Sequence, residues 1–206
     1  MRWMVLMMVW LTATPLWAAA LETELAAIQH RWAEIQYQLP EDEKEKAFEE
    51  LAGEAEQFVK DYPDRAEPLI WQGIVLSTYA GAKGGLGALG LVKDARKSLE
   101  AALAIDEGAL QGSAYTSLGS LYYQVPGWPV SFGDDDQAEK YLQKALAINP
   151  EGIDPNYFFG DYLLEQGEDT RAQVYLKKAL SAPPRPGRET ADAGRRREIS
   201  ERIGNR

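Results

Sequence analysis

Cysteine is absent from the sequence, and His30 is its single histidine. Without cysteine the chain forms no disulfide, has no lipid-bearing cysteine and offers no thiol nucleophile. One histidine is too few for a histidine-rich metal site, and His30 lies off the apolar stripe of its helix, so we expect a solvated residue. Ser117 lacks the flanking glycine of a nucleophile elbow. We therefore predict a protein that is not an enzyme, with no catalytic residue, no metal site and no cofactor.

An excess of basic residues is also missing. The sequence has 22 lysines and arginines against 32 aspartates and glutamates, which gives a net charge of −10. Phosphate backbones need a basic surface, so this balance argues against nucleic acid as a partner. Hydrophobic residues make up 45% and charged residues 26% of the 206 residues. This composition is that of a globular protein long enough to bury a real core.

Long hydrophobic runs are missing after the first twenty residues. Residues 3–11 are apolar, Pro15 follows them, and residues 18–20 are alanines of the kind a signal peptidase reads. A comfortable membrane span needs about 20 apolar residues, so an uncleaved anchor is the less favoured alternative. We interpret residues 1–20 as a signal peptide cleaved after Ala20. The mature chain is expected to be periplasmic and not stably inserted into a membrane.

What the sequence does contain is a repeat with a countable period. An alanine, a leucine and a second alanine recur with the same internal spacing in three places. The copies are Ala95, Leu99 and Ala102; Ala138, Leu142 and Ala145; and Ala172, Leu176 and Ala179. The last two copies are 172 − 138 = 34 residues apart, the period of the tetratricopeptide repeat, a helix-turn-helix unit. We therefore predict an all-α fold, a tetratricopeptide-type helical repeat.

The repeat divides the chain into segments. About three recognisable helix-turn-helix units occupy residues 64–184. An acidic N-terminal helical pair over residues 21–63 precedes them, because an amphipathic stripe ends at Pro40 and a second helix follows it. Residues 185–206 read as a linker and a basic C-terminal helix that caps the open end of the stack.

Glycine recurs at one position in the first helix of each unit, at Gly73, Gly119 and Gly160. A glycine inside a helix costs about 1 kcal/mol relative to alanine. Its return at one phase of the repeat predicts that two helices cross closely at each of these glycines.

Two insertions interrupt the repeat. Twelve residues separate the glycine of the last unit from the first alanine of its second helix, but 19 and 22 residues do so in the earlier units. The extra residues fall at 81–90 and 125–133, in each case between the first and the second helix of a unit. They should emerge on the same edge of the array, where insertions in repeat proteins often form the binding face.

The first insertion contains Gly85-x-Gly87-x-x-Gly90, which formally matches a dinucleotide fingerprint. That fingerprint works only between a strand and a helix, whereas a helix over residues 66–80 precedes it here. We interpret residues 80–90 as a flexible glycine-rich insertion and do not expect nucleotide binding.

Three consecutive aspartates, Asp134, Asp135 and Asp136, follow the second insertion. A calcium loop needs further spaced oxygen ligands, which the sequence does not show. Aspartate at a helix start caps free backbone amides and complements the positive end of the helix dipole. We therefore predict a structural, helix-opening role for the triplet.

The second insertion is aromatic and proline-rich where a polar loop is the norm. Two alternatives stay open: Trp128 and Phe132 fold back as a small satellite core, or they line a pocket or anchor a partner. A rigid aromatic loop over a groove would form one wall of a cavity, and Tyr157 and Phe158 of the next unit are its expected neighbours. The predicted ligand-binding or partner-binding residues are Tyr122, Tyr123, Trp128, Pro129, Phe132, Tyr157 and Phe158.

Several motifs together resemble a known family. They are Leu118-Gly119-Ser120-Leu121-Tyr122-Tyr123, Pro126-Gly127-Trp128-Pro129, Phe132-Gly133-Asp134 and Ile153-Asp154-Pro155-Asn156-Tyr157. In these motifs the chain resembles, over roughly residues 65–200, the exported tetratricopeptide proteins grouped with the T component of TRAP transporters. The resemblance implies a periplasmic helical protein with a hydrophobic cavity or pore. It would cooperate with the substrate-binding protein of a transporter for organic acids or small hydrophobic molecules. Family members often carry a lipid-bearing cysteine, which this chain lacks.

Two functions remain open at this point. The first is a non-catalytic periplasmic binding protein, accessory to the transport of a small organic acid or hydrophobic molecule, with a periplasmic substrate-binding protein as partner. The second is a generic tetratricopeptide scaffold for protein–protein interaction in the cell envelope. An enclosed apolar cavity favours the first function and an open groove lined by charged side chains favours the second. Whether the chain forms an oligomer also stays open.

Overall fold

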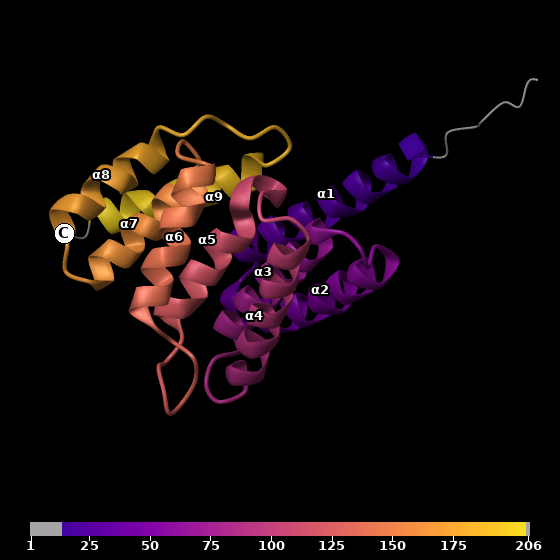
Figure 1. Cartoon of the computed structure of the whole chain (residues 1–206), viewed down its shortest axis with the longest axis horizontal. Coiled ribbons are helices and arrows are strands. Elements are labelled where there is room, and N and C mark those ends of the chain that lie inside the picture. The colour runs from indigo at the N-terminus through magenta and orange to yellow at the C-terminus, as the bar shows by residue number, and fades with distance from the viewer. Residues whose placement is uncertain (1–13, 205–206) are drawn as a thin grey trace, which may run out of the picture.

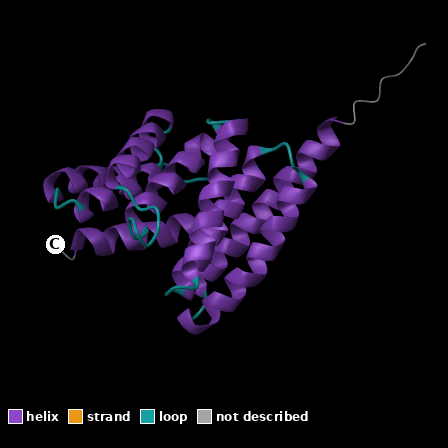
Figure 2. Ribbon diagram, turned by 60° about the horizontal axis from the view of Figure 1, so that its bottom comes forward, coloured by secondary structure: helices purple, strands orange, loops and turns teal. Residues whose placement is uncertain are grey.

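The computed structural model describes residues 14–204, and helices joined by loops make up this part of the chain, with no strand (Figure 2). The helices are α1 (Thr14–Gln38), α2 (Glu41–Asp61), α3 (Ala66–Lys83), α4 (Ala88–Ile105), α5 (Ala109–Gln124), α6 (Asp135–Ile148), α7 (Ile153–Glu165), α8 (Asp169–Leu180) and α9 (Glu189–Gly204). The predicted all-α fold is confirmed. Residues 1–13 of the expected signal peptide lie outside the described residues, and residues 14–20 belong to α1.

The three predicted repeat units correspond to three pairs of packed helices. Helix α3 packs on α4, α5 on α6, and α7 on α8, and the pairs follow one another in chain order along the molecule (Figure 1). The N-terminal pair, α1 and α2, packs on α3 and continues the array. The first helices of the pairs therefore lie next to each other, as α3 with α5 and α5 with α7.

Each repeat unit is held together by the same close crossing. A Cβ atom built on Gly73, Gly119 or Gly160 would lie 2.5, 2.5 or 2.8 Å from the Cγ atom of Leu99, Leu142 or Leu176, respectively. These leucines, and the two alanines that flank each of them, are fully buried. A side chain at the glycine would push the two helices of the unit apart, so the predicted close crossing is confirmed.

The first insertion is mostly helical, which corrects the expectation of a flexible segment over residues 80–90. Helix α3 continues to Lys83 and α4 begins at Ala88, so that only residues 84–87 form a turn. Ala88 and Leu91 pack against the core formed by the repeat, and this burial stabilises the added helical turns. The turn itself reverses the chain through Gly84 and Gly85, whose φ angles of 63° and 58° favour glycine.

The two inserted connections lie at the same edge of the array, as predicted (Figure 1). The second connection ends at Asp134, whose carboxylate accepts a hydrogen bond of 2.9 Å from the backbone amide of Gln137. Asp135 and Asp136 stand in the first turn of α6. The predicted capping role of the triplet is confirmed.

The C-terminal helix makes a connection that the sequence did not predict. Helix α9 packs against α7 and α8, as a cap of the last repeat does, and it also packs against α1. At Gly194 a Cβ atom would lie 2.3 Å from Cγ of Tyr37 on α1. Nearby, Nε2 of the exposed His30 donates a hydrogen bond of 2.7 Å to the Gly187 carbonyl. The C-terminal segment thus bridges the first helix of the chain and the last repeat.

Candidate functional site

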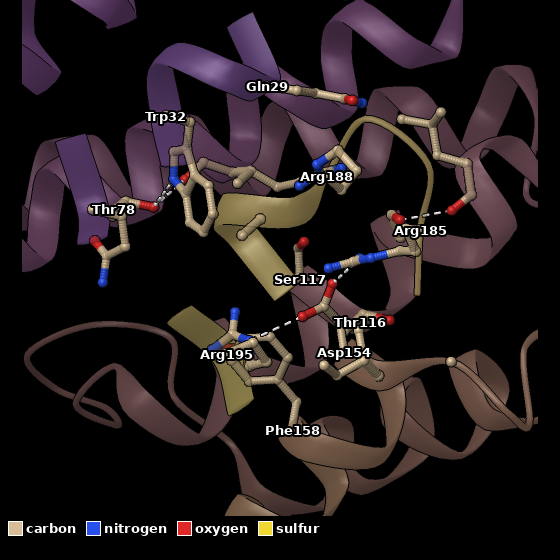
Figure 3. A pocket seen from close by; sticks show the side chains of 18 of the residues that line it. Gln29, Trp32, Thr78, Thr116, Ser117, Asp154, Phe158, Arg185, Arg188 and Arg195 are labelled. Atoms are coloured by element: carbon tan, nitrogen blue, oxygen red, sulfur yellow. Dashed lines mark hydrogen bonds and ion pairs between the residues drawn. The ribbon is translucent and has the colours of Figure 1, made fainter. Parts of the chain in front are cut away.

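A groove of about 850 Å³ lies between the repeat and the C-terminal segment. Helices α1, α3, α5 and α7 provide most of one side, and residues 183–188 with the start of α9 provide the other (Figure 3). The groove is partly open to solvent. It exists because the first helices of successive units lie side by side while the C-terminal segment returns across them.

Uncharged polar side chains are numerous along the groove. They are Gln29, Gln36, Ser77, Thr78, Gln111, Ser113, Thr116, Ser117, Ser120, Gln124 and Asn149. Trp32 and Trp71 lie behind this lining with both side chains buried in the core, and their ring centroids are 6.0 Å apart in an edge-to-face arrangement. The Trp32 indole donates a hydrogen bond of 2.9 Å to Oγ1 of Thr78, which holds α1 against α3. This mixed, open lining differs from the enclosed apolar cavity that would favour the accessory-transport function.

A strained turn shapes the middle of the groove, at the start of α5. Leu110, Gln111 and Gly112 are all left-handed, with φ angles of 47°, 58° and 76°. For Leu110 and Gln111 this conformation costs of order 1 kcal/mol or more each. The Gln111 side chain accepts a hydrogen bond of 2.9 Å from Nδ2 of Asn149, which ties two loops together. Retained strain of this kind is common at binding sites.

A charged cluster forms one wall of the groove, centred on Asp154 at the start of α7. Its carboxylate binds Nη1 of Arg185 at 2.6 Å and Nε of Arg195 at 2.9 Å (Figure 3). Arg185 also binds Asp192 at 2.6 Å. Burial acts to raise the pKa of Asp154, but the guanidinium groups of Arg185 and Arg195 outweigh it and hold that pKa below its usual range. The cluster fastens the linker and α9 to the last repeat.

Two of the predicted site residues reach this cluster. The guanidinium of Arg195 lies 4.4 Å from the ring centroid of Tyr157 and 4.8 Å from that of Phe158. Phe158 lines the groove, whereas Tyr157 is buried in the core. These cation–π contacts position Arg195 against α7.

The other predicted residues lie outside the groove. The Tyr123 hydroxyl donates a hydrogen bond of 2.8 Å to Asp161, and burial, with that carboxylate next, raises the pKa of Tyr123 well above its usual value. Tyr122 contacts Phe132 edge to face with ring centroids 5.3 Å apart. Phe132 is half-buried beneath Arg96, whose guanidinium lies 4.4 Å from its ring centroid.

Trp128 and Pro129 stand apart from all of these contacts, at the exposed tip of the loop, where Trp128 is 89% exposed. The loop therefore divides the two alternatives between its aromatic residues: Phe132 folds back and Trp128 does not. Sequence reasoning missed Asp154, Arg185, Arg188 and Arg195 as groove residues. The signal for the three arginines was a group of arginines in and after a proline-rich linker in an otherwise acidic chain.

Alanine substitutions at Trp128 and Phe132 should have different effects on the free energy of unfolding. Trp128→Ala should change the free energy of unfolding by no more than about 0.5 kcal/mol, because the indole is exposed. Phe132→Ala should lower it by about 2 kcal/mol, less than the penalty for a fully buried phenylalanine, because it loses contacts with Tyr122 and Arg96. Urea unfolding of the two variants measures the difference. Equal losses would show that the indole packs in solution.

Comparisons with known proteins address the fold. The model for the tetratricopeptide repeat matches residues 130–151, which include α6. The crystal structure of TTC0263, a thermophilic TPR protein of Thermus thermophilus, superposes with a TM-score of 0.60 at 20% identity, covering 89% of this chain and 83% of that one. The chain has the tetratricopeptide-repeat fold. The crystal structure of MamA gives a TM-score of 0.46 at 21% identity, covering 82% of this chain and 99% of that one. No curated protein matches the sequence.

Two further features concern this tetratricopeptide-repeat chain. Within residues 14–204, none of the helices combines the length and the apolar character needed to cross a membrane. The same residues contain no group of three or more acidic, histidine or cysteine side chains placed to hold a metal ion.

Proposed function

We propose that this protein is an interaction scaffold that holds a segment of a partner protein in the groove. The observation that carries the proposal is the course of the groove along α1, α3, α5 and α7, with polar side chains from each of them. An extended peptide exposes a backbone donor and acceptor at every residue. A row of serine, threonine and glutamine side chains along the groove can bind these groups repeatedly.

Site-specific photo-cross-linking tests this function. A photoreactive amino acid replaces Ser117, which lines the groove, or Val174, which is 62% exposed on α8 and is not part of the groove. We expect Ser117 to form adducts, in the native cells, with one contiguous segment of a partner, and Val174 to form none with that segment. Ser117→Trp, which fills the groove, should abolish partner binding without unfolding the chain. Adducts that are absent at Ser117, or equal at the two positions, would contradict the proposal.

A narrower role, as an exported accessory to the transport of a small organic acid or hydrophobic molecule, is a second candidate. It is supported by the volume of the groove, which is in the range of small-molecule sites. The basis for export is the sequence pattern of residues 1–20, an apolar run followed by Pro15 and three alanines. Native mass spectrometry and N-terminal sequencing of the protein from its own cells test the two parts. A chain that retains Met1 and carries no small molecule would argue against this role.

A further inference from the structure

The arginines of the C-terminal segment form a cluster whose charges do not balance. Arg185, Arg195 and Arg196 share the carboxylates of Asp154, Asp192 and Glu198 in ion pairs. The fourth arginine, Arg188, also lines the groove, and it alone among the four has no ion pair with any residue that the structure describes. Four guanidinium groups thus face three carboxylates, which leaves one positive charge in surplus.

Arg188 is held in place by its surroundings. Its guanidinium lies 5.0 Å from the ring centroid of Trp71, and its Nε atom is buried without a hydrogen-bond partner. Arg188 directly precedes α9, and in Figure 3 it lies between that helix and Gln29 of α1. Stacking on an indole fixes the plane of a guanidinium, so that its donors keep one direction.

Without an anion, the unpaired guanidinium of Arg188 destabilises the folded chain. Burial, and then the neighbouring charge of Arg185, lower the pKa of Arg188. A buried donor that has lost water and found no acceptor destabilises the folded chain, and an unpaired charge does so more strongly. An anion in front of the guanidinium would satisfy the free Nε donor and neutralise the surplus charge.

We propose that Arg188 is the anion-binding residue of the groove and that its ligand is a carboxylate. The planar fork of a guanidinium matches a carboxylate with two parallel hydrogen bonds. A carboxylate brings one negative charge and balances the surplus of one, whereas a phosphate group brings nearly two. The carboxylate can belong to a peptide segment of the partner or to a free organic acid. The peptide source rests on the proposed function, but the chemistry at Arg188 is the same for both.

Nuclear magnetic resonance of the arginine Nε–Hε groups tests the assignment in the intact protein. The probes are sodium acetate, sodium phosphate, and one short neutral peptide with either a free C-terminal carboxylate or a C-terminal amide. We expect acetate and the free-carboxylate peptide to shift the Arg188 signal saturably, while the amidated peptide does not shift it. A peptide that binds far more tightly than acetate identifies a partner segment as the source, and equal affinities identify a free acid.

Matched variants distinguish binding from a structural role. Arg188→Gln should weaken carboxylate binding at least about tenfold, while Arg197→Gln, at an exposed position on α9, should leave it unchanged. Arg188→Gln should also leave the melting temperature unchanged or raise it, because it removes an unpaired cation. The proposal is overturned if no carboxylate saturates the signal, if phosphate binds more tightly than acetate, or if Arg188→Gln binds as the parent does. Cross-links from Ser117 that persist in that case would leave the scaffold function standing.

Discussion

Replacing Asp154 by asparagine should lower the free energy of unfolding by about 2–3 kcal/mol, somewhat less than the cost of removing one partner from a fully buried ion pair, because its side chain is 29% exposed. The carboxylate is shared by Arg185 at 2.6 Å and Arg195 at 2.9 Å, and an amide would leave both guanidinium groups without its charge. The matched control is Asp64→Asn, because Asp64 is exposed in the turn before α3. Urea unfolding at pH 7 should show a large loss for the first variant and almost none for the second.

The same carboxylate should make stability depend on pH in a defined direction. The pKa of Asp154 is lowered in the folded state, so the unfolded chain takes up a proton at this group more readily than the folded chain. The stabilisation is therefore complete above the ordinary aspartate pKa of about 4 and is lost as the pH falls below that value toward the folded pKa. The difference between the parent and Asp154→Asn should accordingly shrink between about pH 4 and pH 2. A difference that is constant over this interval would show that the ion pairs do not stabilise the fold.

The repeat units could be predicted because their contacts are local. Gly119 meets Leu142, and Gly160 meets Leu176, within one helical pair, so a spacing in the sequence translates directly into a crossing in space. Asp134 caps α6 three residues away for the same reason. Each of these contacts depends on residue types at fixed short separations, which periodicity alone can reveal.

The groove could not be predicted, because it depends on contacts between the two ends of the chain. Gly194 lies against Tyr37, and Gly187 binds His30, across more than 150 residues. The sequence showed a basic C-terminal segment over residues 185–206, but a charge pattern does not say which surface such a segment covers. The position of Arg188 follows only once α9 is placed against α1.

The aromatic loop shows a second reason why the sequence alone does not predict the site. Phe132 and Trp128 are four residues apart in one insertion, and hydrophobicity alone treats them alike. Phe132 is retained by Tyr122 and Arg96, whereas Trp128 has no such partners and is 89% exposed. Which aromatic residue folds back is decided by neighbours on α4 and α5 that a single sequence does not identify.

Replacing Gly194 by leucine should lower the free energy of unfolding by about 3 kcal/mol, at the upper end of the usual cost of overpacking a core. A Cβ atom there would lie 2.3–2.4 Å from Cγ, Cδ1 and Cδ2 of the Tyr37 ring, so the added side chain cannot avoid the ring by rotating. Helix α9 must move away from α1. Gly90→Leu is the control, because Gly90 is exposed in α4 with open space around its Cβ position. That variant should instead gain a few tenths of a kcal/mol from helix propensity.

A second substitution, at Tyr37, should restore part of the stability lost in Gly194→Leu and thereby identify the clash with the ring as the cause of the loss. In the chain with Tyr37→Ala and Gly194→Leu together, the leucine occupies the space that the ring leaves. The double variant should therefore be more stable than the sum of the two single losses predicts, by about 0.5–3 kcal/mol. Hydrogen exchange should report rapid exchange of the α9 amides in Gly194→Leu and renewed protection in the double variant. If the two losses simply add, α9 does not pack on Tyr37 in solution. In that case Arg188 has no fixed place in the groove, since the start of α9 reaches the groove only while this helix contacts α1.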